Sequence, residues 1–398
     1  MVFICRIVNE YVAKRVKFVL PDWDDIVDPN YDFEANRSSE AYKKDKYIFG
    51  ARLWELVGNV VDGVLISLST LTENKLYRIK QLGNVRNFMR IPNSIEVIGD
   101  SGAWQYRYLD TPPITVHRAL ELYEELGVDL GVTVDHIALF GNFRERMEIT
   151  YRNAIEMLDI WKKGRYSFKL MGAVQGLEVK DYLKGLERLY NAGYRTFAIG
   201  GLAKRDTRFI DRLINELIKL THYLNIERIH FLGITRLSVI SKLWELSDYV
   251  GEISFDSSTP LRIAWTREFG NYLTEDGKAY TAIRVNDAEV ITMIRLYDRG
   301  EVTFEVLLDY LKKYLIKTGQ IQYLPYYIAL LKDRPWKKCT CNICKTVGVD
   351  VVIFKGNNRN RRRGFHNVYV FSKLMNRINK FKIQKADTII DNYIKQYN

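Results

Sequence analysis

The feature of this 398-residue chain that most constrains its fold is a repeated alternation of helical stretches and short apolar runs. The apolar runs, each followed by Asp, Gln or Gly, are residues 95–98, 130–134, 168–174, 196–199, 229–232 and 253–255. Between them, residues 116–126, 147–161, 182–192, 209–220 and 237–246 carry apolar side chains at helical three-to-four spacing. Alternation of this kind predicts successive strand–helix units and a parallel sheet.

The number of these units favours a closed barrel. Residues 63–67 fit one earlier strand, whereas the position of a remaining strand is not evident from the pattern. An open doubly wound sheet shares the alternation, but so many consecutive units favour closure into a TIM-type (β/α)8 barrel. We therefore expect a barrel domain over residues 1–300, an inserted zinc-binding subdomain over 301–367, and a C-terminal helix over 368–398 that packs back on the barrel.

Polar or glycine residues follow most of the predicted strands. They are Asp100, Asp135, Gln175, Gly200, Gly201 and Asp256. Taken singly, such residues are ordinary turn formers or helix caps. In a barrel, however, the carboxyl ends of all strands meet at one mouth, where active sites lie. Their convergence, with Asp100 and Asp256 as the principal acids, favours a catalytic site.

A cluster of potential metal ligands lies near the C-terminus. Cys339, Cys341 and Cys344 fall within six positions, and His366 follows later. Three thiolates and one imidazole form a typical tetrahedral zinc site, and clustered cysteines outside a disulfide framework indicate metal in a reducing compartment. Four protein ligands leave no open coordination position, so we expect structural zinc and disfavour a zinc-dependent hydrolase.

The charge balance suggests a polyanionic partner. The formal net charge is +12, which favours nucleic acid, although a general solubility effect would also explain it. Residues 355–385 contain ten Lys or Arg and no acid, and Arg359, Arg361, Arg362 and Arg363 would bind phosphate if exposed. The sequence carries neither a secretory signal nor an apolar run long enough for a membrane span, so we expect a cytoplasmic protein.

Several motifs together resemble one known superfamily. They are Asp100-Ser101-Gly102-Ala103-Trp104-Gln105, Val174-Gln175-Gly176, Gly200-Gly201-Leu202-Ala203, Phe255-Asp256 followed by Pro260 and Arg262, and the zinc ligands followed by Asn367. In this order, over residues 95–367, the chain resembles the tRNA-guanine transglycosylase superfamily. The resemblance implies base exchange at an N-glycosidic bond, in which guanine leaves a polynucleotide and a 7-deazaguanine enters.

The resemblance also implies roles for individual residues. Asp256 would attack the sugar and hold it covalently, and Asp100 would handle protons at the purine. The substrate-binding positions would be Ser101, Trp104, Asp135, Gln175, Gly200, Gly201 and Leu232, with the purine edge paired by the polar groups and its faces covered by Trp104 and Leu232. Arg262 and Arg267 match arginines on the nucleic-acid side. Core packing is the alternative for Trp104 and Leu232, and surface ion pairs are the alternative for the two arginines.

The chain departs from the family pattern at several places. Ala103 stands where a second glycine is common, His136 follows Asp135, and Lys204-Arg205-Asp206 replaces a less basic run. With the short spacing from Cys344 to His366, these departures favour the branch that exchanges guanine for a 7-deazaguanine, such as 7-cyano-7-deazaguanine, in DNA. The alternatives are a queuosine- or archaeosine-type tRNA enzyme and an inactive nucleic-acid-binding partner subunit, against which the retention of both acids argues. A homodimer or helper proteins are further expectations.

Overall fold

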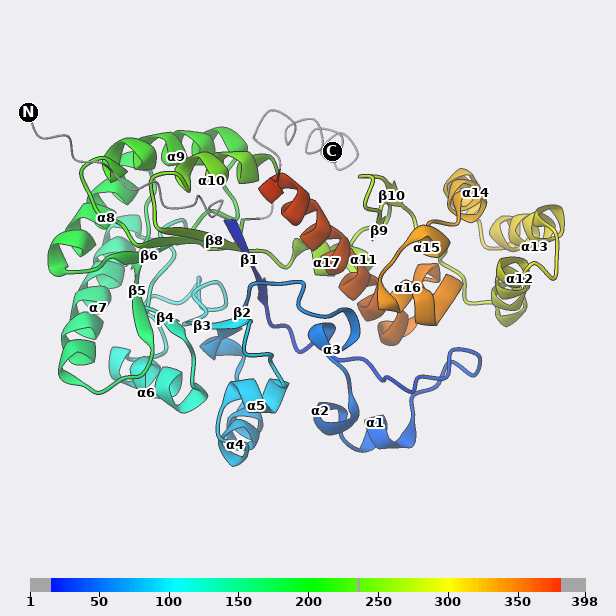
Figure 1. Cartoon of the computed structure of the whole chain (residues 1–398), viewed down its shortest axis with the longest axis horizontal. Helices are drawn as coiled ribbons and strands as arrows, with labels where there is room; N and C mark the ends of the chain where they lie inside the picture. The colour runs from blue at the N-terminus through cyan, green and yellow to red at the C-terminus, as the bar shows by residue number, and fades with distance from the viewer. Residues whose placement is uncertain (1–15, 235–236, 381–398) are drawn as a thin grey trace, which may run out of the picture.

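The structure is a computed structural model that describes residues 16–234 and 237–380. Eight parallel strands form a closed barrel in which each strand pairs with the next along the chain. They are β1 (Val16–Pro21), β2 (Gly63–Ser67), β3 (Glu96–Asp100), β4 (Leu130–Val132), β5 (Lys169–Val174), β6 (Thr196–Ile199), β7 (Arg228–Phe231) and β8 (Glu252–Asp256). Pairing of β1 with β8, which places Val19 beside Asp256, closes the barrel (Figure 1). The predicted TIM-type (β/α)8 fold is confirmed.

Side chains alternate between the two faces of the barrel strands, as the two-residue period of a strand requires. One cluster packs inside the barrel and consists of Val19, Leu65, Ile98, Leu130, Val132, Met171, Ala173 and Ala198. Their chain neighbours, such as Phe18, Val64 and Phe197, belong instead to the larger core between strands and helices. The barrel interior is therefore packed with side chains rather than open as a pore.

From β2 onward, helices follow each strand on the outside of the barrel. They are α4 (Glu73–Gln81), α5 (Val85–Met89), α6 (Val116–Leu126), α7 (Phe143–Lys163), α8 (Val179–Ala192), α9 (Thr207–Thr221), α10 (Ile240–Leu246) and α11 (Thr259–Thr266). The sequence of α6 explains its bounds, because the Thr115 side chain caps its first turn and Gly127 ends it in the left-handed conformation. Across the described ranges, no helix is both long and apolar enough to cross a bilayer.

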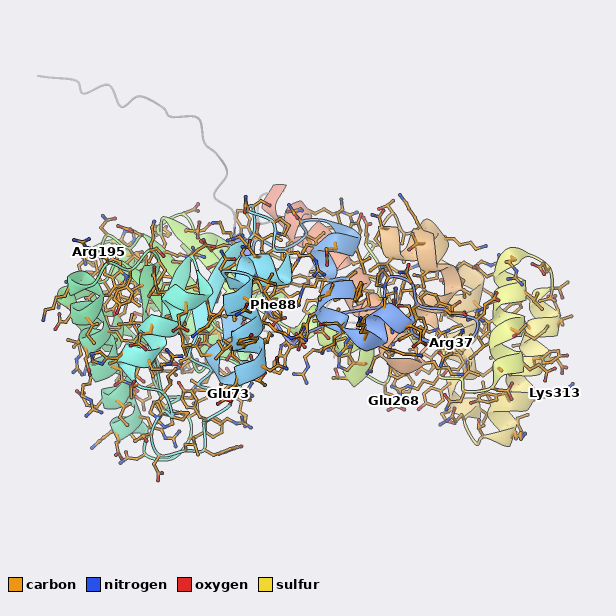
Figure 2. All side chains as sticks on the ribbon, turned by 90° about the horizontal axis from the view of Figure 1, so that it is seen from below. Arg37, Glu73, Phe88, Arg195, Glu268 and Lys313 are labelled. Carbon is orange, nitrogen blue, oxygen red and sulfur yellow. The ribbon has the colours of Figure 1, made fainter. Side chains whose placement is uncertain are left out.

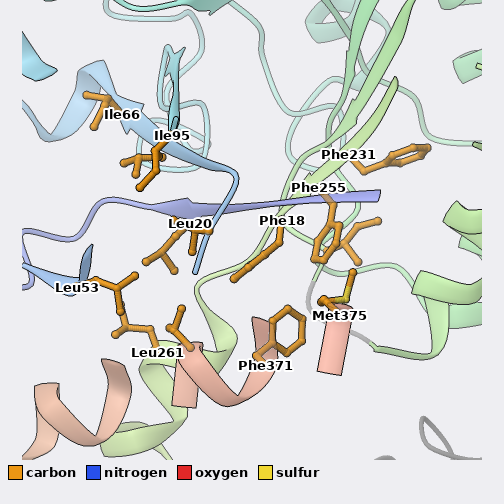
Figure 3. Close-up of a cluster of buried hydrophobic side chains, with 14 of the residues drawn as sticks. Phe18, Leu20, Leu53, Ile66, Ile95, Phe231, Phe255, Leu261, Phe371 and Met375 are labelled. Atoms are coloured by element: carbon orange, nitrogen blue, oxygen red, sulfur yellow. The ribbon is translucent and has the colours of Figure 1, made fainter. Parts of the chain in front are cut away.

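The strand that the sequence pattern left unplaced is β1, which precedes the regular alternation. Its Phe18 contacts Phe255 of β8 with ring centroids 5.6 Å apart, and Phe371 packs 4.8 Å from Phe18 (Figure 3). Phe371 belongs to α17 (Gly356–Lys380), so a helix from the far end of the chain covers the seam between β1 and β8. Residues 368–380 of the expected C-terminal helix form the second half of α17, and residues 381–398 lie outside the described residues.

After α11 the chain leaves the barrel and forms a helical lobe. Its elements are β9 (Tyr272–Leu273), β10 (Ala279–Tyr280), α12 (Ala288–Arg299), α13 (Phe304–Lys317), α14 (Leu324–Asp333), α15 (Pro335–Lys338) and α16 (Asn342–Val347). The molecule is elongated, with the barrel at one end and α12–α14 at the other (Figure 1). Figure 2 shows Arg195 and Lys313 near these two ends. The domain boundaries at residues 300 and 367 stay a prediction, and α17 crosses the second of them.

The arginines at the start of α17 lie inside the protein, which corrects the prediction of a phosphate-binding stretch. Arg359, Arg362 and Arg363 are buried, and Arg361 is largely covered. Arg363 is fully buried and donates hydrogen bonds to the backbone carbonyls of Ala264 at 2.6 Å and Val351 at 3.1 Å. A guanidinium has five donors, so it can satisfy several carbonyls that would otherwise be unpaired in the interior. Since the prediction required exposure, it fails for the three buried side chains.

The remaining arginines of this stretch hold the segment between β1 and β2 against the helical lobe. That segment contains α1 (Glu40–Lys44), α2 (Lys46–Phe49) and α3 (Leu53–Val57). Arg359 donates to the Phe33 carbonyl at 2.6 Å, Arg362 donates to the Asp28 carbonyl, and Arg361 pairs with Asp25 at 3.1 Å. These contacts join residues more than three hundred positions apart and therefore stabilise the arrangement of the two parts.

Candidate active site

A cavity of about 350 Å³ opens at the carboxyl ends of the barrel strands. Of the predicted site residues, it is lined by Asp100, Trp104, Asp135, Gln175, Gly200, Gly201, Leu232, Asp256 and Arg262. These residues lie at the ends of six different strands or in the segments that follow them, so the barrel brings together positions that are far apart in the sequence. A volume of this size suits a small flat ligand such as a nucleobase.

Asp256 ends β8 and is buried, with 7% of its surface exposed. Its Oδ1 accepts a hydrogen bond of 2.9 Å from the backbone N–H of Gly233. Gly233 has φ of +70°, a left-handed conformation that favours glycine and turns this N–H toward the carboxylate. The buried His230 ring lies beside the same oxygen, with Nε2 3.3 Å away. The Gly233 N–H therefore holds the carboxylate, and the His230 ring lies close to the same oxygen without, among the described residues, a hydrogen bond of regular geometry.

Asp100 ends β3 and accepts a 2.9 Å hydrogen bond from the backbone N–H of Gly102. Gly102 has φ of +89°, and an added Cβ would lie 2.0 Å from the Ser69 hydroxyl, so only glycine fits this turn. Burial raises the pKa of Asp100 to about 8, and the nearby charges of Asp135 and Asp256 add to this shift. A carboxyl group with this pKa is largely protonated at neutral pH and can act as a general acid.

Asp135 and Gln175 form a connected pair of buried polar groups. Gln175 Nε2 donates to Asp135 Oδ2 at 2.6 Å, and the Ser101 hydroxyl donates to Asp135 Oδ1 at 3.1 Å. Ser101 is in turn 2.7 Å from the Tyr106 hydroxyl, which donates to the Asp135 carbonyl. Among the described residues, Gln175 Oε1 has no hydrogen-bond partner although it is buried, and so it is available to a ligand. Burial raises the pKa of Asp135, which these hydrogen bonds partly oppose.

Gly200 and Gly201 leave room for the Gln175 side chain. An added Cβ at Gly200 would lie 2.2 Å from Gln175 Nε2, and one at Gly201 would lie 2.8 Å from Oε1. Gly201 also has φ of +72°, so its backbone is suited to glycine. The two glycines thus allow the backbone after β6 to approach the polar edge of the cavity closely.

Trp104 and Leu232 both line the cavity, as expected for side chains that cover a flat ring. Trp104 is 39% exposed, which argues against the alternative that it is an ordinary core residue. The Arg107 guanidinium lies 4.6 Å from the Trp104 ring, and Lys204 Nζ lies 5.0 Å from the Phe140 ring. Aromatic rings and cations therefore alternate along this edge of the cavity.

Arg262 and Arg267 occupy different environments on α11. Arg262 is exposed, lines the cavity, and places its guanidinium 5.1 Å from the ring of Trp23. Arg267 follows the last turn of the helix and is half-buried. Only Arg262 of the two is therefore in the wall of the cavity.

The four predicted metal ligands converge. The Sγ atoms of Cys339, Cys341 and Cys344 lie 3.5, 3.4 and 3.3 Å from His366 Nδ1. Bond lengths of about 2.3 Å to sulfur and about 2.0–2.1 Å to nitrogen place tetrahedral ligands of one zinc ion roughly 3.5 Å apart, so the donor set fits such an ion. His366 Nε2 is 2.8 Å from the Leu273 carbonyl, which leaves Nδ1 free of hydrogen and able to bind metal.

The ligands come from α16, α17 and the turn after α15, and a neighbour from β9 supports them. Tyr272 stacks on His366 with ring centroids 4.1 Å apart, and its hydroxyl lies 3.2 Å from Cys344 Sγ. A metal ion here would tie these elements of the lobe together. The residues can hold a metal, and the site lies in the helical lobe rather than in the wall of the cavity.

Sequence reasoning missed several residues of the site. Tyr106 orients Asp135, Trp23 and Ser67 line the cavity, and His230 touches Asp256. A signal for His230 was present, because a two-residue period in β7 places it on the inner face. Trp23 follows β1 and Ser67 ends β2, the strands with the weakest pattern.

A comparison with models of known protein families finds no match. The chain is 30% identical, over 411 aligned positions, to a curated protein from Salmonella montevideo named DNA-guanine transglycosylase. The alignment covers 89% of this chain and 95% of that protein, so it spans nearly the whole of both. Similarity of this extent, with a TIM-type barrel and a Cys3His cluster, identifies the chain as a guanine transglycosylase, which is a glycosyltransferase enzyme. It belongs to the DNA-guanine transglycosylase family.

Proposed function

We propose that this enzyme exchanges guanine in DNA for a 7-deazaguanine through a covalent intermediate on Asp256. The observation that carries the proposal is the pairing, in one cavity, of a carboxylate held by the Gly233 N–H with a second acid whose pKa is about 8. Two carboxyl groups with separated roles are what displacement at a glycosidic carbon requires. The relative's name supports DNA as the polymer.

In the first step, a carboxylate oxygen of Asp256 attacks C1′ of the nucleotide and the C1′–N9 bond breaks. The electron pair goes to the departing purine, which takes a proton from neutral Asp100. The products are a sugar ester of Asp256, free guanine and the Asp100 carboxylate. The raised pKa of Asp100 supports this role, because a proton must be present on it at neutral pH.

In the second step, the incoming base gives the proton from its N9 to Asp100. Its N9 attacks C1′, and Asp256 leaves as a carboxylate. The enzyme returns to its starting protonation state, so the same pair of acids serves both halves of the exchange. This reversal of roles agrees with general acid–base catalysis at a glycosidic centre.

Recognition of the base would use the polar pair at the bottom of the cavity. Asp135 can accept N–H hydrogen bonds from the purine edge, and the unpartnered Oε1 of Gln175 offers one more acceptor. Trp104 and Leu232 would cover the two faces of the ring. An extracted base needs both edge pairing and face contacts, because it has lost its stacking partners in the polymer.

The rim of the cavity supports contact with a polynucleotide. Arg107 and Lys204 place positive charge beside the exposed Trp104 ring, and Arg262 does so beside the exposed Trp23 ring. This arrangement suits phosphates and neighbouring bases. The same features would also suit a tRNA substrate. The proposal of DNA as the polymer therefore rests on the name of the similar protein. We further propose that the metal is zinc and that it supports the fold, since its ligand set is closed.

The test is to offer labelled guanine and 7-cyano-7-deazaguanine to the enzyme with duplex DNA, single-stranded DNA and tRNA in parallel. We expect incorporation into DNA, with different rates for the duplex and the single strand because extraction from a stack costs a few kcal/mol. Asp256→Ala should abolish incorporation, and Asp100→Ala should severely reduce it. Incorporation into tRNA alone would overturn the DNA assignment, and wild-type exchange by Asp256→Ala would overturn the mechanism.

A further inference from the structure

A column of buried polar side chains runs through the barrel interior beneath Asp256. Its members are Arg228 and His230 on β7 and Ser254 on β8, each buried, with His230 and Ser254 at 0% exposure. On the other strands most of the interior is filled by an apolar cluster, and the polar groups nearest to Asp256 are those of β7 and β8. The proposed reaction steps use none of these three residues.

The donors in this column fix the direction of each hydrogen bond. Both terminal nitrogens of Arg228 pair with the Glu96 carboxylate, at 2.8 and 2.6 Å, which orients the guanidinium. Arg228 has donors only, so at 3.3 Å the Ser254 Oγ accepts from it. The Ser254 hydroxyl hydrogen is then available for His230 Nδ1, which lies 2.9 Å away. If Nδ1 accepts this hydrogen, the proton of the neutral ring is on Nε2, the nitrogen that faces Asp256.

We propose that His230 is a positioning residue for the nucleophile, held by Ser254 and Arg228 in the tautomer that donates from Nε2 to Asp256 Oδ1. The proposal rests on the proposed function, in which Asp256 is the nucleophile. With the Gly233 N–H also on Oδ1, both donors would hold one oxygen and direct Oδ2 toward the sugar. No proton moves along the column, and the imidazole acts only by donating a hydrogen bond.

The His230 ring is close enough to Asp256 for a hydrogen bond, but its orientation in the free enzyme is not yet favourable for one. Nε2 lies 3.3 Å from Oδ1, and in the described part of the chain it makes no hydrogen bond of regular geometry. Catalytic hydrogen bonds are often long in the free enzyme and tighten along the reaction. The bond would gain most when Asp256 leaves the sugar as a full carboxylate, since hydrogen bonds to charged acceptors are the stronger ones.

The first test observes the ring directly and does not depend on activity. The chain has five histidines, so long-range proton–nitrogen NMR spectra of the histidine-labelled full-length protein can be assigned by comparison with His230→Gln. We expect His230 to be neutral with hydrogen on Nε2, to lose this preference in Ser254→Ala, and to shift at Nε2 in Asp256→Asn. A hydrogen on Nδ1, or a doubly protonated ring, would overturn the proposal.

The second test separates positioning from structural support. We expect His230→Leu to lower kcat for base exchange roughly a hundredfold with the KM for the free base nearly unchanged, as when one preorganised donor to a reacting oxygen is removed. His230→Gln, whose amide can donate from nearly the same place, should recover about tenfold or more of this loss. His222→Gln, at an exposed histidine after α9, is the matched control and should exchange bases like the wild type.

The outcomes distinguish this proposal from the proposed function. If His230→Leu folds normally and keeps the wild-type kcat, the positioning role is wrong while base exchange stands. If His230→Gln is as slow as His230→Leu although both unfold at the same temperature, donation from Nε2 is not what matters. If the wild type exchanges no base on any polynucleotide, the proposed function fails, and the NMR test still decides the tautomer.

Discussion

Replacing Asp100 by asparagine should make the stability of the protein less sensitive to pH. Asp100 is held in the fold with a pKa of about 8, against an ordinary value of 3.8, chiefly because of burial. Between these two values the folded protein binds a proton that the unfolded chain releases. The free energy of unfolding of the wild type therefore falls as pH rises through this window. Asparagine has a similar shape and cannot ionise, so this contribution disappears.

The size of the effect follows from the pKa difference. Each unit of pKa difference corresponds to about 1.4 kcal/mol, and the change from pH 5 to pH 8 covers most of the window. The stability of Asp100→Asn relative to the wild type should therefore increase by about 3.5 kcal/mol between pH 5 and pH 8. Below about pH 3 the aspartate is neutral in both the folded and the unfolded protein, so the relative stability should no longer change.

Urea unfolding followed by tryptophan fluorescence at pH 5, 6, 7 and 8 measures this difference. Asp159→Asn, at an exposed position on α7, is a matched control that removes a carboxylate outside the cavity. We expect the control to show much less pH dependence relative to the wild type. A relative stability of Asp100→Asn that stays constant from pH 5 to pH 8, or falls, would show that Asp100 is not held protonated in the fold.

Three further predictions concern the polar pair, the metal and the buried arginine. Gly200→Ala should raise the KM for guanine more than tenfold, because its Cβ would displace Gln175, while the unfolding temperature measured by fluorescence changes little. Cys341→Ser, or removal of metal by a chelator, should lower both metal content by atomic spectroscopy and the unfolding temperature. Arg363→Met should destabilise the protein by about 3 kcal/mol or more in urea unfolding, because buried carbonyls lose their donor, whereas Arg361→Ala should cost much less. Equal stability of the two arginine variants would contradict this account of α17.

The regular part of the fold was predictable because hydrophobic period and strand-end residues agree with each other. The ranges 63–67, 116–126 and 196–199 match β2, α6 and β6 at both ends. The expected helix at 237–246 instead begins with a 3-10 turn at Leu237–Val239 before α10. β1 escaped detection because it precedes the alternation, and its outer face is covered by α17 from the other end of the chain. The packing of α17 on β1 joins opposite ends of the chain, so no local sequence pattern predicts it.

The candidate site was predictable where motif residues lie at strand ends, as Asp100, Asp135 and Asp256 do. Exposure was not predictable for the arginines of α17. Their sequence resembles a solvated basic stretch, but Arg363 is buried against the backbone carbonyls of Ala264 and Val351. Backbone partners leave no trace in sequence composition. The distribution of charge along a chain therefore cannot distinguish arginines that bind phosphate at the surface from arginines that bind backbone carbonyls in the interior.

The most direct test of the account is to trap the enzyme on its substrate. Wild-type protein is incubated with guanine-containing duplex DNA in the absence of an incoming base, denatured, and analysed by gel and by mass spectrometry of its peptides. We predict one DNA adduct per active chain, release of one guanine per adduct, and attachment at Asp256, with no adduct in Asp256→Ala. An adduct at another residue, or base exchange by Asp256→Ala at the wild-type rate, would contradict the central claim.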